Sequence, residues 1–264
     1  MLSHVDMAAV EAAESHQEIA ELISDRGWWN PVLLELFTDT AIEEISLSNS
    51  TISPSIGPGP LLTHFFQQGT FTRLSRLTLK GIPLSLYDIS LLRLLPQLML
   101  LNVSNTQATT THLLHLATHA ATLSVLDISG NPLIDDDCRV PLTALTRLKS
   151  LYLRGTAVTM PCLRLLVYAL PSECRLMTIP QSCLDYFNNR GKRYCITIPT
   201  GYVQDPRLVA GLSMSALKHN LELHKQANRD IMLTGTRIDL VDRLKGMLCA
   251  RVADGRIVAR VGKG

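Results

Sequence analysis

The chain has 264 residues, of which 46% are hydrophobic and 18% are charged, and its formal net charge is +2. This composition excludes a disordered polar tail and predicts a folded protein with a sizeable core. The charge is uneven, because residues 206–264 contain 11 Lys and Arg against 5 Asp and Glu, a net charge of +6, whereas residues 1–205 carry −4. We therefore expect attraction to anions, including nucleic acids, only in the C-terminal fifth.

The N-terminal segment 1–22 has acidic residues where a secretory signal needs basic residues and an apolar run, and later apolar stretches are interrupted by charges or prolines. We expect neither secretion nor a membrane span. The six cysteines include no CxxC pair, which argues against a zinc cluster and is typical of reduced thiols. The expected location is the nucleus or the cytoplasm, and we expect no metal and no cofactor.

Residues 1–40 are predicted to form a helical N-terminal cap. The stretch AAVEAAESHQEIAELI, residues 8–23, has a helical apolar pattern, and WWNPVLLELF follows it from Trp28. A core built from stacked units needs its first unit covered. We expect Trp28, Trp29, Leu36 and Phe37 to cover it.

Six segments then share one spacing of apolar residues, L-x-x-L-x-L-x-x-(N/T/S/other)-x-(apolar). They are IEEISLSNSTI from Ile42, LSRLTLKGIPL from Leu74, LMLLNVSNTQA from Leu98, LSVLDISGNPL from Leu123, LKSLYLRGTAV from Leu148 and the degenerate CRLMTIPQSCL from Cys174, whose apolar positions include Met177 and Ile179. Their starts are 32, 24, 25, 25 and 26 residues apart, and a loop, SPSIGPGP at 53–60, accounts for the longer first spacing. Each alternation predicts a short strand with one buried face.

Helical patterns lie between these strands, at 84–97, 109–122, 142–147 and 160–171. The segments resemble those of leucine-rich repeat proteins, in particular the intracellular ribonuclease-inhibitor-like and F-box-associated classes. This resemblance implies an α/β solenoid over residues 41–205, with a curved parallel sheet on one side and helices on the other. Such a fold presents broad surfaces for binding.

One position of the pattern, where this family usually has asparagine, is filled by Ser50, Ile82, Thr106, Asn131, Thr156 and Ser182. At the other positions a hydroxyl would have to satisfy the backbone groups of the turn. Isoleucine has no polar group, so we expect an irregular ladder at Ile82.

The strand residues that alternate with the buried leucines are expected to line one continuous surface. Its mixed polar and aromatic chemistry suits a protein epitope better than a phosphate backbone. The candidate protein-binding residues are Arg76, Lys80, Asn102, Asp127, Tyr152 and Arg154. The alternative is that these residues are simply solvated.

Residues 193–199, RYCITIP, predict a β-rich run, and residues 206–264 predict a helical module with a basic tail. Within the module, Leu217 and Leu221 mark a first helix, and Leu240, Leu244 and Leu248 mark a second. In the tail, Asp254-Gly255 between alternating apolar residues predicts a hairpin.

This module resembles the SAP motif of DNA- and chromatin-associated proteins through Gly235, Arg237, Leu240, Arg243 and Leu244. Its first half also resembles the PADR1 segment of poly(ADP-ribose) polymerases, although it has about five extra residues in ANRDIM and lacks the cysteines of that family, so a zinc role is not implied. The resemblance implies DNA or RNA binding. The candidate residues are Lys218, Lys225, Arg229, Thr236, Arg237, Arg243 and Lys245. The alternative is a two-helix cap whose basic residues only aid solubility.

Other constellations carry less weight. His112, His115 and His119 share a helix face without an accompanying carboxylate, so we expect a solvated face rather than a metal site. The run Asp135-Asp136-Asp137 is expected to cap a helix. The chain contains no GxGxxG, GxxxxGK[ST], HExxH or GxSxG motif, and nothing places a base beside a cysteine.

The sequence therefore predicts a non-catalytic adaptor that has no small-molecule substrate. The solenoid would bind a protein, and the C-terminal module would bind nucleic acid or chromatin. The alternative is a substrate-recognition subunit of a ubiquitin-ligase type complex, docked through residues 6–37, although this segment contains no convincing F-box.

Overall fold

A computed structural model describes residues 13–48, 50, 62, 67 and 69–261. The chain divides into two compact units. The N-terminal unit comprises Met1–Thr159, Ala169–Pro180 and Gly262–Gly264, and the C-terminal unit comprises Met160–Tyr168 and Gln181–Val261. The C-terminal unit thus begins before residue 206, because its core includes Ile198 and Val209 as well as the predicted leucines.

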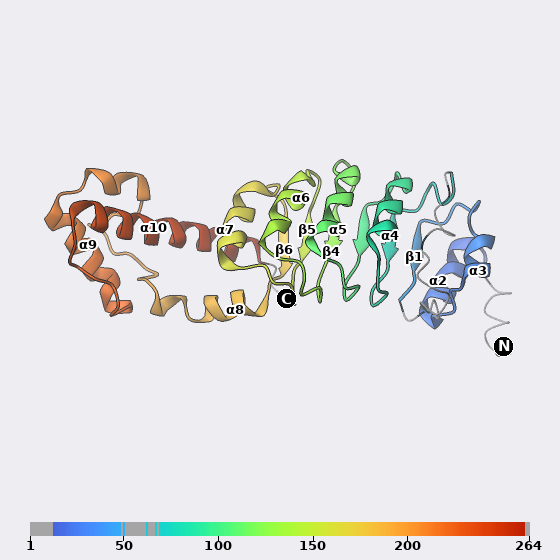
Figure 1. Cartoon of the computed structure of the whole chain (residues 1–264), viewed down its shortest axis with the longest axis horizontal. Helices are drawn as coiled ribbons and strands as arrows, with labels where there is room; N and C mark the ends of the chain where they lie inside the picture. Colours follow the sequence, from blue (N-terminus) through green and yellow to red (C-terminus); the bar gives the residue numbers. More distant parts are fainter. Residues whose placement is uncertain (1–12, 49, 51–61, 63–66, 68, 262–264) are drawn as a thin grey trace. The chain divides into compact units, whose positions relative to one another are not determined.

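The N-terminal unit contains a six-stranded, all-parallel sheet in which the strands are neighbours in chain order (Figure 1). The strands are β1 (Glu44–Ser46), β2 (Arg76–Thr78), β3 (Leu100–Asn102), β4 (Val125–Asp127), β5 (Ser150–Tyr152) and β6 (Arg175–Thr178). The central residue of each of the first five strands is buried and its two neighbours are not, as the alternating pattern predicts. The six predicted strands and the α/β fold class are confirmed.

Helical segments connect the strands, and α4, α5 and α6 follow one another along the sheet in the same order (Figure 1). The segments are α4 (Leu86–Leu91) with η1 (Leu92–Leu94), α5 (Thr110–Leu114) with η2 (His115–His119), and η3 (Asp136–Cys138) with α6 (Arg139–Ala144). Asp135 is the N-cap of η3 and accepts a hydrogen bond from the Asp137 backbone N–H, so the predicted capping role of this acidic run is confirmed.

Buried side chains satisfy the turns that follow the strands. Asn131 is fully buried, and its Oδ1 accepts hydrogen bonds from the backbone N–H groups of Thr106 and Ala108, both at 3.0 Å. Its Nδ2 donates to the carbonyls of Val103 and Ile128 at 2.8 and 2.9 Å. One amide therefore joins two successive turns.

In two other segments, a hydroxyl group stands at the position of the pattern that Asn131 fills, as expected. Thr106 Oγ1 donates to the Val103 carbonyl, and Thr156 Oγ1 donates to the Leu153 carbonyl, both at 2.8 Å. β2, which precedes Ile82, pairs with β1 and β3 without a register shift, and the irregular ladder expected at Ile82 itself stays a prediction.

The one irregularity of the ladder lies between β5 and β6, where Leu151 pairs with Leu176 but Tyr152 pairs with Thr178. This shift places Met177 in a bulge, so Leu176 is buried and Met177 is 37% exposed. The prediction that Met177 faces the core is therefore wrong.

The N-terminal cap consists of α2 (His16–Arg26) and α3 (Pro31–Leu36). Trp29 is fully buried, and its ring lies edge-on to that of Phe37, which is also buried. Leu36 was expected to join them, but it is 69% exposed because it lies on the solvent side of α3. Residues 1–12 and the loop predicted at 53–60 lie outside the described residues.

The C-terminal unit is helical. It contains most of α7 (Met160–Ala169), followed by α8 (Gln181–Asn188), η4 (Arg190–Lys192), η5 (Pro206–Gly211), α9 (Met214–Ala227) and α10 (Arg237–Arg260). The helices α9 and α10 confirm the two helices predicted after residue 214. The stretch 193–199 forms no strand; instead the backbone N–H of Cys195 donates to Nδ1 of the buried His224. None of the described helices is long and apolar enough to cross a membrane.

The hairpin predicted at Asp254-Gly255 is wrong, because both residues lie within α10. The Asp254 carboxylate is 1% exposed and receives hydrogen bonds from Arg164, Tyr186 and Tyr194. The shortest distance, 2.6 Å, joins Tyr194 Oη to Asp254 Oδ2. Burial and this hydrogen bond raise the pKa of Tyr194 far above its ordinary value, so the phenol remains a proton donor.

Candidate functional site

The residues predicted to bind a protein lie on or just after the strands of the N-terminal unit. Asn102, Asp127 and Tyr152 are neighbours in register at the ends of β3, β4 and β5. Arg76 begins β2, and its guanidinium forms an exposed ion pair with Glu44 at 3.1 Å. The two remaining residues, Lys80 and Arg154, are exposed beyond the ends of β2 and β5.

Two of these residues also serve the backbone. Asn102 Oδ1 accepts a hydrogen bond from the Ser104 N–H, and Asp127 Oδ1 accepts one from the Ser129 N–H, both at 2.9 Å. Each side chain therefore stabilises the turn after its own strand. Tyr152 has no such bond among the described residues and stays a candidate contact.

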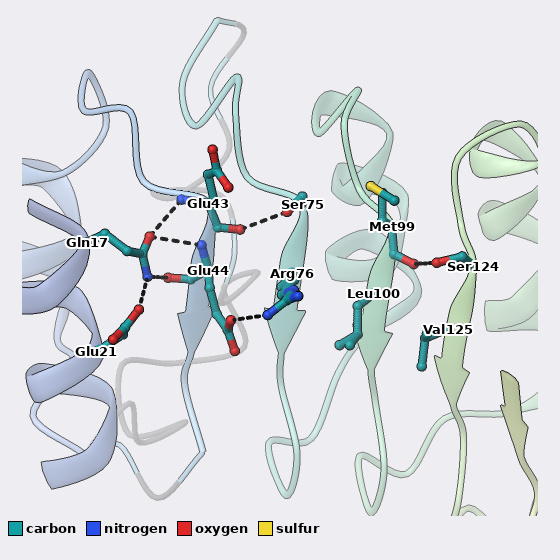
Figure 2. Close-up of a pocket in the computed structure, with 10 residues that line it drawn as sticks. All are labelled: Gln17, Glu21, Glu43, Glu44, Ser75, Arg76, Met99, Leu100, Ser124 and Val125. Carbon is teal, nitrogen blue, oxygen red and sulfur yellow. Dashed lines mark hydrogen bonds and ion pairs between the residues drawn. The ribbon is translucent and has the colours of Figure 1, made fainter. Parts of the chain in front are cut away.

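A hollow of about 390 Å³ lies at the beginning of strands β1 to β4. Figure 2 shows the residues that line it, which come from α2, from these strands and from the residues just before them. They are Gln17, Glu21, Glu43, Glu44, Ser75, Arg76, Met99, Leu100, Ser124 and Val125. This volume lies within the range of about 300–1,000 Å³ that is usual for ligand pockets.

The Gln17 side chain forms one wall of the hollow and covers the open edge of β1 (Figure 2). Its Oε1 accepts hydrogen bonds from the backbone N–H groups of Glu43 and Glu44 at 2.8 and 3.2 Å. Its Nε2 donates to the Glu44 carbonyl and to Glu21 Oε1. The amide thus takes the place of a neighbouring strand, which satisfies the edge of the sheet and fixes α2 beside it.

The hollow is acidic. Three carboxylates, those of Glu21, Glu43 and Glu44, line it with a single guanidinium, that of Arg76. Within the described residues, the Glu43 carboxylate has no hydrogen bond or ion pair, and Glu21 contacts only the neutral Gln17 amide. The lining therefore carries a surplus of negative charge.

Apolar side chains form the other side of the hollow. Leu100 and Val125 are paired neighbours on β3 and β4, and both are half-buried. Met99 is 50% exposed. Two serines complete the wall, and their hydroxyls donate to backbone carbonyls of the preceding segments. The hollow therefore joins an acidic side to an apolar side.

Only Arg76 among these lining residues was predicted as a binding residue. Gln17 and Glu21 lie on α2, more than 20 residues before β1, and the sequence does not indicate which part of that helix reaches the sheet. Met99 offered a signal, because LML places an apolar residue where the pattern expects a polar one. Leu100 and Val125 give the same signal at the first strand positions.

In the C-terminal unit, the structure places the seven predicted nucleic-acid-binding residues on α9, on the segment after it and on the first turns of α10. Lys218, Arg229 and Lys245 are exposed, and Lys225 is half-buried. These four residues have no ion pair among the described residues. Their ammonium and guanidinium groups are available to an anion.

The two predicted arginines of α10 bind backbone carbonyls. Arg237 Nη2 donates to Ala210 and Leu212, at 2.6 and 3.1 Å, and Arg243 Nη1 donates to Met232 and Thr234, at 2.6 and 3.3 Å. Arg237 thereby holds the segment that precedes α9, and Arg243 holds the segment that precedes α10. Their positive charge remains, but part of their hydrogen-bonding capacity is used.

Thr236, which was predicted to contact a phosphate, is the N-cap of α10. Its Oγ1 accepts from the Asp239 N–H, while the Asp239 carboxylate accepts from the Thr236 N–H and hydroxyl. The Thr236 hydroxyl is the main cause of a lowered pKa at Asp239. A carboxylate therefore already occupies the position at which a phosphate would meet this helix.

A second basic cluster, which the sequence analysis missed, follows α8. Arg190, Lys192 and Arg193 fall within four residues, and the Arg193 guanidinium lies 4.5 Å from the centre of the Tyr186 ring. In total, the C-terminal unit contains 14 Lys and Arg against 7 Asp and Glu, a net charge of +7. The N-terminal unit contains 11 against 16, a net charge of −5.

The histidine face that was expected to be solvated is largely buried. His112 is 7% exposed and caps α5, since its Nδ1 accepts a hydrogen bond from the Thr109 N–H. His119 is 3% exposed, and burial lowers the pKa of both imidazoles. Across the described part of the chain, no three His, Cys, Asp or Glu side chains are grouped to hold a metal ion.

No protein-family model matches the chain, and no curated protein sequence matches it. The geometry and the charge of the two units are therefore the basis for a function.

Proposed function

We propose that the protein is a non-catalytic adaptor, whose N-terminal unit is a leucine-rich repeat solenoid that binds a protein. The binding surface is its strand face, which is formed by the outward-facing side chains of β1 to β6. Six parallel strands with a near-constant spacing in the sequence and a shared turn geometry support the solenoid. The main observation in favour of protein binding is the hollow, which extends across β1 to β4 of the N-terminal unit. A pocket that crosses four strands presents several short segments to one ligand.

We propose further that the C-terminal unit binds DNA or RNA. Its net charge of +7 and the unpaired cations Lys218, Arg229 and Lys245 support this role. The resemblance of α9 and α10 to the SAP motif supports it independently. Because Asp239 occupies the N-terminus of α10, most of the attraction is expected to come from these exposed cations rather than from the helix N-terminus.

The nucleic-acid role is tested by fluorescence anisotropy of labelled 30-nucleotide DNA and RNA with the full chain at rising salt. Changing Lys218, Arg229 and Lys245 to Glu is expected to weaken binding at least tenfold and to flatten the salt dependence. The matched control changes three exposed arginines of the N-terminal unit, Arg93, Arg139 and Arg147, to Glu. Equal losses in both variants, or salt-insensitive binding by all three proteins, would contradict the proposal.

The protein-binding role is tested by affinity purification from nuclease-treated cell extract. The variant Leu100→Ala with Tyr152→Ala and Arg154→Glu alters the strand face both in the hollow and at the end of β5, and the control Thr118→Ala alters an exposed residue of η2. Partners that bind the strand face are expected with wild type and control but not with the variant. Recovery of ubiquitin-ligase subunits would favour a substrate-recognition subunit, whereas identical recovery with all three proteins would remove the strand face from the function.

A further inference from the structure

We propose that the hollow at β1 to β4 binds a lysine or arginine side chain from an extended peptide segment that also carries an apolar residue. This inference rests on the proposed protein-binding function of the N-terminal unit and specifies the chemistry of its ligand. The juxtaposition that carries it is an acidic side, formed from α2 and β1, and an apolar side, formed by Leu100 and Val125, which line the same hollow with the paired Arg76 between them (Figure 2).

The acidic wall selects a cation. The Glu21 and Glu43 carboxylates line the hollow without a positive partner in the described residues, and the only guanidinium in the lining belongs to Arg76. That guanidinium is paired with Glu44, and both side chains of the pair are about half exposed. A ligand cation that binds beside Glu21 or beside Glu43 therefore meets a carboxylate without a positive partner, whereas an acidic ligand is repelled.

The apolar side selects a long side chain. Lysine and arginine bury their aliphatic stems on apolar surface while the charged group stays with polar partners. Leu100 and Val125 are adjacent across β3 and β4, so together they form a surface for such a stem or for a neighbouring apolar residue. Met99 is half exposed beside them, and its flexible side chain adapts to the shape of the ligand.

The wall is also held in place before any ligand binds. The Gln17 amide makes four hydrogen bonds, three to the backbone of residues 43–44 and one to Glu21. It therefore fixes α2, and with it Glu21, relative to β1. Pre-positioned carboxylates bind a cation with less loss of side-chain entropy than mobile ones.

A nucleic acid does not suit this site, because the N-terminal unit carries a net charge of −5 and two carboxylates would face the phosphates. The hollow also lacks the ligands for a metal ion, since no three His, Cys, Asp or Glu side chains of the described residues are grouped to hold one. A basic and apolar peptide satisfies both sides of the hollow.

The experiment applies the purified chain of 264 residues to a library of nonapeptides. Each position of these peptides is randomised among all amino acids other than cysteine. Wild type, the charge variant Glu21→Gln with Glu43→Gln, and the matched control Glu35→Gln with Glu173→Gln are compared. Both residues of the control are exposed in the N-terminal unit and lie outside the hollow, so the two variants lose the same formal charge. Circular dichroism establishes that all three proteins are folded.

Wild type and control are expected to enrich peptides with Lys or Arg next to Leu, Met or Phe. The charge variant is expected to bind the best such peptide about tenfold more weakly in a fluorescence anisotropy titration at low salt. Replacing the lysine of that peptide by norleucine is expected to cause a similar loss in wild type and almost none in the charge variant. Leu100→Ala is expected to reduce the enrichment of Leu, Met and Phe in the bound peptides without reducing the enrichment of Lys and Arg.

Three outcomes would overturn the inference. Enrichment of acidic or uncharged peptides would contradict the chemistry while leaving a protein-binding strand face intact. Equal affinities of the charge variant and the control would remove the hollow from binding. The wild type could also self-associate as its concentration rises. If the charge variant loses this self-association, the ligand of the hollow is a second copy of this chain. Failure of the strand-face variant to lose any partner in extract would instead overturn the proposed function itself.

Discussion

The two units of the molecule bury polar groups in different ways. In the N-terminal unit, buried amides and hydroxyls such as Asn131 and Thr106 bind backbone groups of successive turns. In the C-terminal unit, a buried carboxylate, Asp254, is paired with the Arg164 guanidinium and accepts hydrogen bonds from two phenols. A neutral amide can satisfy a donor and an acceptor of the backbone at once, which suits stacked turns. An ion cluster suits a single junction between helices.

This difference also decides how much of each unit is destabilised when its buried polar group is removed. The Asn131 amide satisfies four backbone groups locally, so its loss affects two turns. Asp254 joins α10 to α7, to α8 and to Tyr194, so its loss affects the whole junction of the C-terminal unit. The changes below separate the two cases, from the largest expected effect to the smallest.

Asp254→Ala is expected to lower the free energy of unfolding of the C-terminal unit by at least about 3 kcal/mol. The substitution leaves the Arg164 guanidinium and two tyrosine hydroxyls without their acceptor, and a buried charge that loses its partner is strongly destabilising. Urea denaturation measures the change, and hydrogen exchange assigns it to residues of this unit. Asp230→Ala, an exposed aspartate of the same unit, is the control and should change stability by less than about 0.5 kcal/mol. Equal effects would contradict the clustered role of Asp254.

Asn131→Ala is expected to cost about 3 kcal/mol, because it removes four hydrogen bonds and leaves buried backbone groups of two turns unsatisfied. Increased hydrogen exchange is expected at the Thr106 and Ala108 amides, in the N-terminal unit only. The exposed Gln97→Ala is the control. A loss below about 1 kcal/mol would show that water or a backbone shift replaces the amide.

Gly130→Ala is expected to destabilise the N-terminal unit by about 1–2 kcal/mol. Gly130 has a φ of +69°, and an added Cβ would clash with Asn105 Oδ1. Gly246→Ala is the informative counterpart in the C-terminal unit, because Gly246 lies within α10 with no atom near an added Cβ. That change should stabilise by about 0.5–1 kcal/mol. The same sign for both, in thermal denaturation, would contradict this difference.

Acidification below pH 6.5 is expected to destabilise both units. Burial lowers the pKa of His119 in the N-terminal unit and of His224 in the C-terminal unit, where Arg251 lowers it further. The unfolded chain therefore binds more protons in this window, and stability is lost as the pH falls from 6.5 toward the folded-state pKa values. The loss is at most about 1.4 kcal/mol per group for each pH unit.

Urea denaturation at pH 7.5 and 5.5 measures this dependence. His224→Gln is expected to remove the part that belongs to the C-terminal unit, and His119→Gln the part that belongs to the N-terminal unit. A pH dependence that neither variant changes would assign the effect to other groups, among them His112, whose pKa burial also lowers.

The left-handed positions of the N-terminal unit repeat with the strands. Gly81, Asn105, Gly130 and Gly155 all have a positive φ, and each lies seven residues after the first leucine of its segment. The sequence contained this signal, since glycine and asparagine are the residues that adopt this conformation at the lowest cost. It strengthens the expectation of equivalent turns without any knowledge of contacts.

The sequence by itself determined the strands and their order, because alternation within five residues decides which face of a strand is apolar. It also predicted a helix through Leu240, Leu244 and Leu248, and the residues that begin this helix, Thr236 and Asp239, cap it through local bonds. Only the tertiary structure decided that Leu176 rather than Met177 is buried, that His112 and His119 are covered, and that Asp254 lies within a helix rather than a hairpin. Only the tertiary structure also decided the acidic hollow, because Gln17 bonds to the backbone beside β1 although it lies more than 20 residues earlier in the chain, and it brings Glu21 with it. Local patterns fix local conformation, whereas burial and charge pairing depend on which distant segments meet.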